Sequence, residues 1–331
     1  MLRVLILGVW LSLVSNVRAQ ERTDLVPPCQ GEAFRAKEDD STRTLNHHAF
    51  VPFQSLPFPF VTTRLSSNTG MGVVRLKAIA VPNLGVVSTD DAKLVSFTQT
   101  FLGDFRILKW LGLSTGFGLG NAVGINSSGA FNLGINYAFG ATLGLNVRLA
   151  QRGIWYLSMR GDGLWQRAEA VLPAALAQSA RASDGAVTFA LSSLTRGGSV
   201  ANGASHLSFA IAPHPMYGVF VTGGYRYQNV DVGSASGGTG SLLFGVGNQL
   251  RLNPLGVPVV VTLGGSVQVR TDQSRRVFFS TVGSQGTTLG LVESGILYSN
   301  AKFLDAGVQL TWSVARNDRR TQAVLVLNHF W

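Results

Sequence analysis

The stretch between residues 131 and 149 alternates strictly between two kinds of side chain. Every odd position from Phe131 to Leu149 is apolar, whereas the even positions hold asparagine, glycine, alanine, threonine and arginine. Successive side chains of a β-strand point to opposite faces, so this stretch has one apolar face and one small or polar face. A helix would distribute both sets around its axis. The alternation therefore predicts a long β-strand.

The same alternation returns at residues 242–252, 257–270 and 304–314. Ordinary strands are about 5–6 residues long, whereas a tilted strand that crosses a bilayer needs about 9–11 residues. The strands of a soluble β-sandwich, which is the alternative, are shorter, and its surface carries more charge. The repeated length therefore favours strands that span a membrane.

Two pairs of aromatic residues indicate the height of the lipid-facing band. Trp155 and Trp165 share one face of a predicted strand, and Tyr217 and Tyr227 repeat the same spacing. Ten residues at about 3.3 Å each, tilted by about 40°, rise about 25 Å, which is the height of the apolar band of a membrane barrel. We therefore expect these four residues to form aromatic girdles at the two membrane interfaces.

Composition leaves a closed barrel as the membrane-spanning solution. Charged residues make up only 13% of the chain, about half the usual share, and the mean hydropathy is +0.23. Glycine, at 39 residues, interrupts almost every apolar stretch. Beyond the N-terminus no uncharged apolar run reaches the length of about 18 residues that a membrane helix needs. Because only helices and closed barrels satisfy the backbone inside lipid, the strands must close into a barrel.

Short and long connections alternate along the chain, as periplasmic turns and external loops do in such barrels. The short ones are residues 151–153, 213–215 and 253–256, and the long ones are residues 167–200, 230–239 and 271–286. We predict an all-β fold, a transmembrane antiparallel up-and-down barrel over residues 71–331 with about twelve strands, although 10 to 14 strands fit the pattern. An even number places both ends of the wall on the periplasmic side. The predicted strands are 71–82, 92–103, 107–122, 131–149, 154–166, 201–212, 216–229, 240–252, 256–270, 287–299, 303–315 and 321–331.

The first 70 residues differ from the barrel region. Residues 1–19 have a positive start, an apolar stretch and a small-residue cleavage site, which predict a cleaved secretory signal peptide. Prolines within residues 51–60 exclude a central strand there. We expect residues 20–70 to be irregular, either as a periplasmic extension or as a plug-like segment folded into the barrel mouth. The single cysteine, Cys29, cannot form an internal disulfide.

The chain ends on an aromatic residue, Trp331, and Leu327, Leu325 and Ala323 share its face. With this ending, residues 71–331 resemble the bacterial outer-membrane β-barrel superfamily, whose last strand typically finishes in an aromatic residue. His329 departs from the superfamily pattern, which has an aromatic or apolar residue two places before the end. The resemblance implies localisation in the bacterial outer membrane and partners among outer-membrane lipids and lipopolysaccharide. It also implies that Trp331 is the signal that the barrel-assembly machinery reads.

The face opposite the apolar one should line the lumen. The isolated charges of the strands are expected on this luminal face, because a cation at the midplane of the lipid face costs about 2–4 kcal/mol. Inward glycines such as Gly118, Gly245 and Gly264 should leave room in the lumen. The expected lumen-lining charged residues are Arg75, Lys77, Arg148, Arg160, Asp162, Arg226, Arg251, Arg270 and Asp305.

A net basic lumen favours anions, as basic rings do in anion pores. We therefore expect a porin-like channel or passive transporter for small solutes, anionic or amphipathic ones among them. The alternative is a structural or adhesive surface barrel without transport. The formal net charge of +10 is spread singly along the chain. The sequence has no basic cluster with interleaved aromatic residues, so nucleic-acid binding is not expected.

No enzymatic or metal motif has its expected context, and no cofactor is expected. Residues 112–116 fit G-x-S-x-G around Ser114, but the strand-turn-helix that a nucleophile elbow needs is missing. His206 and Ser208 share one strand face, as a histidine base and a serine nucleophile do in outer-membrane lipid acyl hydrolases. Leu207 and its neighbours take the lipid face, so this pair should point into the lumen, and lipid hydrolysis is the less favoured alternative. The histidines have no metal-ligand spacing.

Overall fold

The computed structural model describes residues 43–76, 80–81, 85–86, 92–125, 135–171, 195–232, 235–271, 288–300, 303–314 and 318–331. The predicted signal peptide, Cys29 and Lys77 lie outside these ranges. Within the described part of the chain, no helix is long and apolar enough to cross a membrane.

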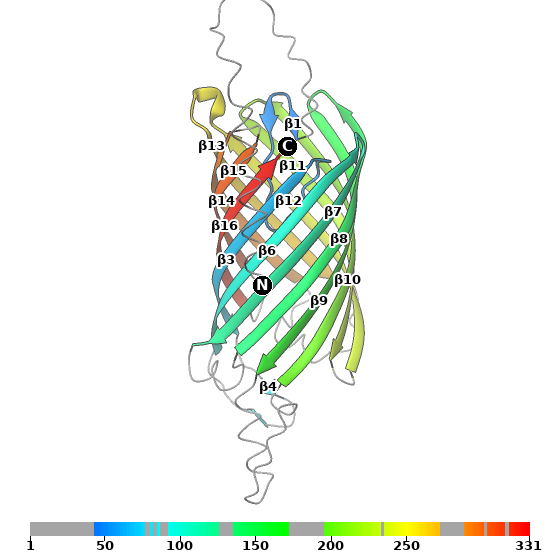
Figure 1. Ribbon diagram of the computed structural model, residues 1–331, viewed down its shortest axis with the longest axis vertical. Coiled ribbons are helices and arrows are strands. Elements are labelled where there is room, and N and C mark those ends of the chain that lie inside the picture. Colours follow the sequence, from blue (N-terminus) through cyan, green and yellow to red (C-terminus); the bar gives the residue numbers. More distant parts are fainter. Residues whose placement is uncertain are drawn as a thin grey trace, which may run out of the picture. The chain divides into compact units, whose positions relative to one another are not determined.

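Twelve antiparallel strands close into a barrel, which confirms the predicted fold class (Figure 1). The barrel strands pair in chain order, and the last pairs with the first. They are β3 (Arg64–Leu76), β6 (Ala92–Leu108), β7 (Leu111–Gly124), β8 (Ile135–Arg152), β9 (Trp155–Val171), β10 (Thr195–His214), β11 (Tyr217–Val232), β12 (Ala235–Arg251), β13 (Val259–Arg270), β14 (Thr288–Ser299), β15 (Leu304–Val314) and β16 (Asp318–Phe330). The remaining elements are two small hairpins and a short 3-10 turn: β1 (Thr44–Leu45) with β2 (His48–Ala49), β4 (Ala80–Val81) with β5 (Gly85–Val86), and η1 (Asn253–Leu255).

The first barrel strand begins earlier than the sequence pattern predicts, at Arg64 instead of residue 71. Its early part lacks apolar alternation because polar residues occupy the outer face as well as the inner one. On the outer face the Ser67 and Thr69 hydroxyls both bond to the side-chain amide of Gln99 on β6. These groups satisfy one another, so the strand can be polar on both faces at this level.

Both ends of the wall meet at one end of the barrel. Arg64 of β3 pairs with Phe330 of β16, and the backbone N–H of Trp331 donates to the carbonyl of Thr63 (3.3 Å). Connections at this end are short: two residues separate β6 from β7. At the opposite end residues 172–194 separate β9 from β10. Because short turns mark the periplasmic end of outer-membrane barrels, we call this end periplasmic and the opposite end external.

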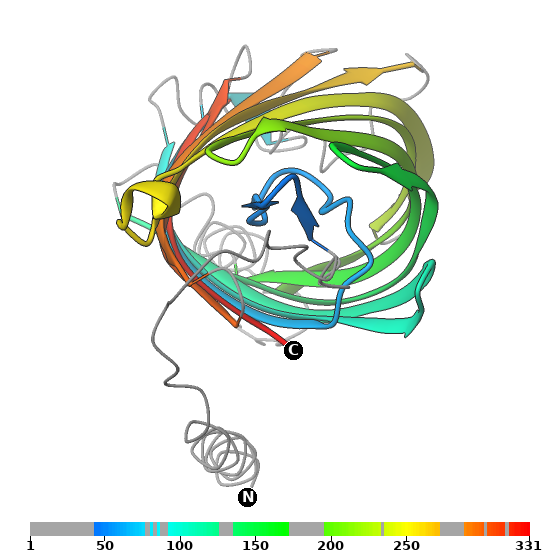
Figure 2. The ribbon, with the colours of Figure 1, turned by 90° about the horizontal axis from the view of Figure 1, so that it is seen from above.

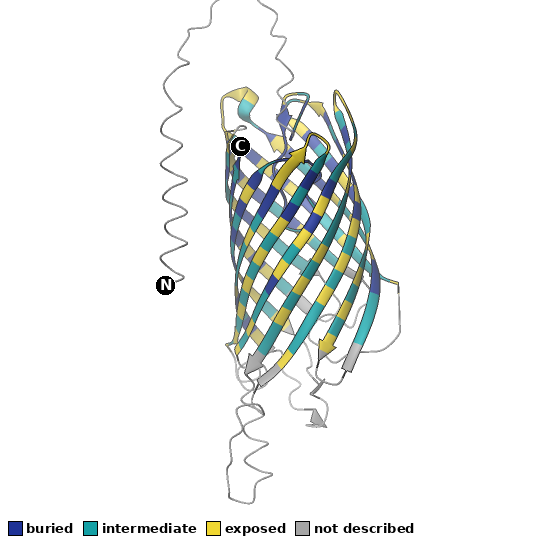
Figure 3. Ribbon diagram, turned by 45° about the vertical axis from the view of Figure 1, so that its right-hand side comes forward, coloured by how far each residue is buried: buried dark blue, intermediate teal, exposed yellow. Residues whose placement is uncertain are grey.

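Exposure alternates along the strands and sorts side chains into an outer and an inner face (Figure 3). On β8 the outward Leu143 and Leu145 are 62% and 51% exposed, whereas the inward Gly144 and Asn146 are buried. Apolar residues dominate the outer face on every side of the barrel. A continuous apolar band of this kind is stable when lipid covers it.

Residues 43–63, which we call the plug, lie inside the barrel (Figure 2), and β1 of the plug lies at the end of the barrel that carries the C-terminus (Figure 1). Phe50, Val51 and Val61 of the plug are at most 1% exposed. Of the two alternatives for residues 20–70, the structure thus places residues 43–63 in the lumen, whereas residues 20–42 lie outside the described ranges. The plug continues directly into β3, so its position is tied to the first strand of the wall.

Candidate functional site: the lumen and its plug

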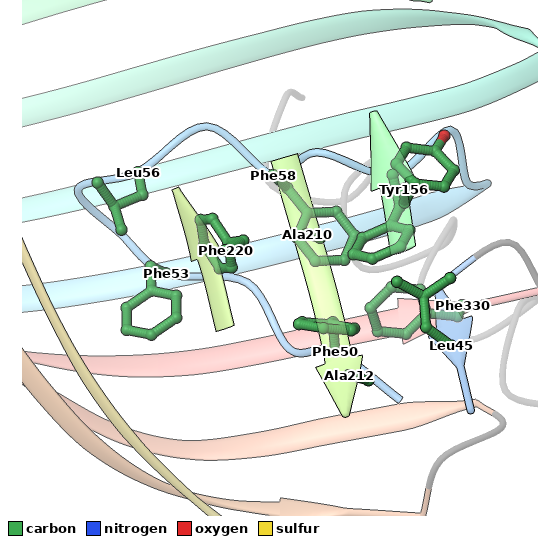
Figure 4. Close-up of a cluster of buried hydrophobic side chains, with 11 residues drawn as sticks. Leu45, Phe50, Phe53, Leu56, Phe58, Tyr156, Ala210, Ala212, Phe220 and Phe330 are labelled. Atoms are coloured by element: carbon green, nitrogen blue, oxygen red, sulfur yellow. The ribbon is translucent and has the colours of Figure 1, made fainter. Parts of the chain in front are cut away.

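Aromatic side chains form the centre of the plug (Figure 4). The Phe60 ring packs on Phe50, with centroids 5.0 Å apart, and on Tyr156 of β9 at 4.6 Å. Phe53 meets Phe220 of β11 edge to face at 5.3 Å. Burying one such side chain contributes about 1.5–3 kcal/mol. The cluster therefore gives the plug an apolar core shared with the barrel wall.

Inward glycines of β12 and β13 make room for this core. A Cβ on Gly264 would lie 2.7 Å from the Phe53 ring, and one on Gly247 would lie 2.8 Å from the same ring. A Cβ on Gly245 would overlap Leu56. On β7, by contrast, a Cβ on Gly118 would meet nothing closer than 3.9 Å. The glycines of β12 and β13 therefore admit the plug, whereas open space remains above Gly118.

Polar side chains of the wall bond to the irregular backbone of the plug. The Glu293 carboxylate on β14 accepts hydrogen bonds from the backbone N–H groups of Gln54 (2.8 Å) and Ser55 (2.9 Å). The Gln249 amide on β12 accepts from the N–H of Val51 (2.9 Å) and donates to its carbonyl. Both wall residues are 0% exposed. These bonds replace the β-ladder that the prolines prevent, as buried backbone groups require.

Further polar residues continue this pattern around the barrel. The Gln309 amide on β15 donates to the carbonyl of Pro52 (3.0 Å). On β8 the Asn146 amide donates to the carbonyls of Pro59 (3.2 Å) and Phe60 (3.0 Å). The Tyr156 hydroxyl accepts from the N–H of Val61 (3.0 Å). The plug backbone is thus bound from five strands of the wall.

An ion pair fixes the start of the plug. The Arg43 guanidinium forms a salt bridge with the Asp305 carboxylate on β15, and both side chains are at most 3% exposed. The same guanidinium lies 3.5 Å from the centroid of the Phe330 ring. The Ser299 hydroxyl donates to Asp305 (2.6 Å). A buried charge needs such partners, so Arg43 and Asp305 depend on each other.

A second charged group lies on the wall beside and above the plug. The Arg64 Nε donates to Asp104 of β6 (3.0 Å), and the Ser114 hydroxyl donates to the same carboxylate (2.7 Å). Arg160 of β9 lies 3.7 Å from Asp104 and donates from its Nε to both oxygens of Asp162 (2.8 and 2.9 Å). Arg64 lies at 5.0 Å from the Phe58 ring of the plug. Sequence reasoning missed Arg64 and Asp104 because both fall outside the predicted strands.

The structure places most of the predicted lumen-lining residues on the inner face. Arg251 and Asp305 are buried beside the plug, and Arg148 lies at the periplasmic end of β8, where it donates to Gln151. The others lie higher on the wall. They are Arg160, Asp162, Arg226 and Arg270, which share the alternation of the buried or half-buried inner positions of their strands.

Arg75 is a correction, because it lies on the outer face. It is exposed and shares the alternation of Leu65, Met71 and Val73, which are exposed apolar residues of β3. The inner face of β3 is instead formed by its even-numbered positions. Arg75 lies near the external end of the strand, where it pairs in register with Lys93 of β6. At this level a charge can reach the lipid headgroups and escapes the cost of the midplane.

The predicted girdle residues lie on the outer face. Trp165, Tyr217 and Tyr227 are 47%, 40% and 52% exposed, and Trp155 stacks on Phe209 of β10 with centroids 6.2 Å apart. The last residue, Trp331, is 55% exposed and follows β16 directly.

His206 and Ser208 both face the lumen and are buried, but they do not form a hydrogen-bonded pair. The Ser208 hydroxyl donates to Thr222 of β11 (3.1 Å). Ser114 lies near the start of β7, and its hydroxyl donates to Asp104. Among the described residues, no group of three or more His, Cys, Asp or Glu side chains could hold a metal ion.

Comparison with known proteins supports the fold. No family model and no curated protein matches the sequence. The translocator domain of the autotransporter NalP from Neisseria meningitidis superposes with a TM-score of 0.53 at 12% identity, over 82% of this chain and 89% of that chain. An outer membrane channel from Pseudomonas putida F1 has a TM-score of 0.48 at 15% identity, over 85% of this chain and 100% of that chain. The chain thus has the fold of the bacterial outer-membrane β-barrel proteins.

Proposed function

We propose that the protein is an outer-membrane channel for small solutes, which the plug holds closed at the periplasmic end. The observation that carries the proposal is the way in which the plug is attached. Glu293, Gln249, Gln309, Asn146 and Tyr156 bind its backbone through single hydrogen bonds or pairs of them.

Such bonds orient the plug without making its release prohibitive. Each hydrogen bond contributes only about 0.5–1.5 kcal/mol net, because both partners bond to water once they separate. The polar attachment therefore favours a closure that can open, and the external half of the lumen keeps open space beside Gly118.

The charges of the inner face favour anions over cations. Arg226 and Arg270 lie on the inner wall, and neither lies within salt-bridge distance of a carboxylate in the described part of the chain. The described inward acids are engaged: Asp104, Asp162 and Asp305 bind arginines, and Glu293 binds the plug. A basic lining of this kind raises the local concentration of anions.

Release of the plug tests the channel. Glu293→Ala removes the acceptor of two plug N–H groups, and we expect the open probability in planar bilayers to rise at least tenfold over the wild type. Gln268→Ala is the matched control, because Gln268 is also an inward amide but bonds to Ser241 and not to the plug. Reversal potentials under a KCl gradient should indicate anion selectivity.

The structural or adhesive barrel makes the opposite prediction. If Glu293→Ala and a chain without the plug both insert and remain silent, the channel proposal is wrong. If both conduct with cation selectivity, the channel stands and the anion preference is wrong.

A further inference from the structure

The lumen above the plug has two different walls. The plug forms its floor, since Phe53 and Leu56 reach Gly264 and Gly245 on the inner face of β13 and β12. On one wall, β6, β7, β8 and β9 form a recess of about 250 Å³ that has no charged residue in its lining. Its lining includes Thr98, Thr100, Gly118, Gly120, Thr142 and Leu164.

The other wall carries two arginines in one row. Arg226 of β11 pairs in register with Ser241 of β12, which pairs with Arg270 of β13. Strands lie about 4.8 Å apart, so the two arginine backbones are about 10 Å apart with a serine between them. Arginine side chains are long enough to converge on one anion at this spacing, and guanidinium groups bind carboxylates through paired N–H donors.

Asp162, whose charge acts on Arg226, is already bound to another arginine. Both oxygens of Asp162 accept from the Nε of Arg160, at 2.8 and 2.9 Å. The Ser241 hydroxyl is buried and accepts from the Gln268 amide (2.9 Å). Arg226 and Arg270 therefore form a cationic site at the external end of the described wall.

Strand geometry puts the arginines and the recess at the same level. A row of in-register residues runs across the strands from the periplasmic end of β3 to the external end of β13. With strands tilted about 40°, this row climbs about 3 Å per strand, so Arg226 lies about 19 Å and Arg270 about 25 Å above Arg64. Gly120 lies about 21 Å above Arg64 by the same geometry. The row consists of Arg64, Asp104, Ser114, Gly144, Asp162, Ala204, Arg226, Ser241 and Arg270.

The two features also face each other. In the ring of twelve strands, β7 and β13 lie six positions apart, which is half of the circumference. A molecule in the chamber therefore has arginines on one side and an uncharged recess on the other.

We propose that this chamber binds small amphipathic organic anions, with the carboxylate on Arg226 and Arg270 and the apolar part directed toward the recess. The inference deepens the proposed function by naming the class of solute, and it rests on that function in taking the chamber as the external entrance of the channel. Binding is measured in an experiment that does not depend on conduction, so the proposed solute class and the proposed channel function can fail separately.

Hexanoate is the probe. Hexan-1-ol is its matched partner without the charge, and acetate is its matched partner without the long alkyl group. Binding is measured by calorimetry on the full chain in lipid nanodiscs, with empty nanodiscs subtracted. We expect hexanoate to bind more tightly than either partner. The double variant Arg226→Gln, Arg270→Gln should weaken hexanoate at least tenfold, and Arg226→Lys, Arg270→Lys should restore part of the loss because it keeps the charge.

The recess has its own variant. A Cβ on Gly118 or Gly120 would meet no atom closer than 3.7 Å, so Gly118→Val, Gly120→Val fills the recess without disturbing the strand backbone. It should weaken hexanoate about tenfold and leave acetate unchanged. Arg75→Gln removes an arginine from the outer face and should change neither. Heat-modifiable migration on gels verifies that each variant is a folded barrel.

Three results would overturn the proposal. Equal binding of hexanoate and hexan-1-ol would show that the arginines do not bind the carboxylate. Unchanged hexanoate binding in the glutamine double variant would show the same. Equal binding of hexanoate and acetate would remove the recess. The plug-release recordings use KCl alone, so they test the channel whatever hexanoate does.

Discussion

At the scale of single residues, the role of an inward side chain depends on what lies opposite it. Gly264 and Gly118 both occupy inward positions of the alternating pattern, and the sequence predicts that both leave room in the lumen. In the structure the space above Gly264 holds the Phe53 ring, whereas the space above Gly118 is open. A sequence pattern assigns both residues to the lumen but cannot tell which position the plug reaches.

This difference predicts that the same substitution disturbs the plug at one position and not at the other. Gly264→Ala places a methyl group 2.7 Å from the Phe53 ring and 3.2 Å from a backbone oxygen, so the ring must shift. Overpacking of this kind costs about 1–3 kcal/mol. The backbone N–H groups of Val51 and Gln54, which bond to the wall, should then exchange with deuterium about tenfold faster in the folded protein. Gly118→Ala should leave both rates as they are, and equal rates in the two variants would contradict the assigned packing.

At the scale of elements, the strands could be predicted from sequence and the plug could not. Each strand meets lipid along one face, so its alternation is written locally in residues such as 131–149. The plug is held by partners that are remote in sequence: Val51 bonds to Gln249 and Gln54 to Glu293. Its prolines exclude a strand but do not specify where the segment lies. The error at Arg75 has a similar cause, since the adjacent Val73 and Val74 are compatible with either face.

One element of the plug should respond to pH. The pKa of the His48 imidazole in β2 is lowered from 6.5 to about 4, mainly by burial and to a smaller extent by the Arg251 charge. The ring bonds through Nδ1 to the carbonyl of Pro215 in a periplasmic turn (3.1 Å). Because this pKa is depressed in the docked plug, docking is fully stable above about pH 6.5. It weakens as the pH falls from 6.5 toward 4, since released His48 binds a proton that the docked ring does not.

Acidification should therefore open the channel through His48. From pH 7.5 to pH 5 the docked state loses about 2 kcal/mol, so the open probability in bilayers should rise at least tenfold. His48→Asn keeps a polar side chain but does not titrate, and it should remove this component of the pH response. A response of the same size in His48→Asn would assign the effect to other groups.

At the scale of the whole molecule, the wall and the plug differ in how they satisfy their backbones. Every strand of the closed barrel pairs on both sides, so the wall supplies its own hydrogen bonds within the membrane. The plug relies on side chains of the wall, and those side chains face the lumen. If the plug leaves, Glu293, Gln249 and Gln309 become accessible to water and need no protein partner. The wall can thus persist without the plug, although the reverse does not hold.

A chain from which residues 43–63 are deleted should therefore still form a barrel. We expect it to keep heat-modifiable migration, with a lower unfolding temperature, because Tyr156 and Phe220 lose their aromatic partners in the plug. In planar bilayers it should conduct steadily, whereas the full chain opens briefly. An unfolded deletion variant would mean that the plug is part of the barrel's obligatory core. In that case Glu293→Ala should lower stability without raising conductance, because closure and folding would be the same event.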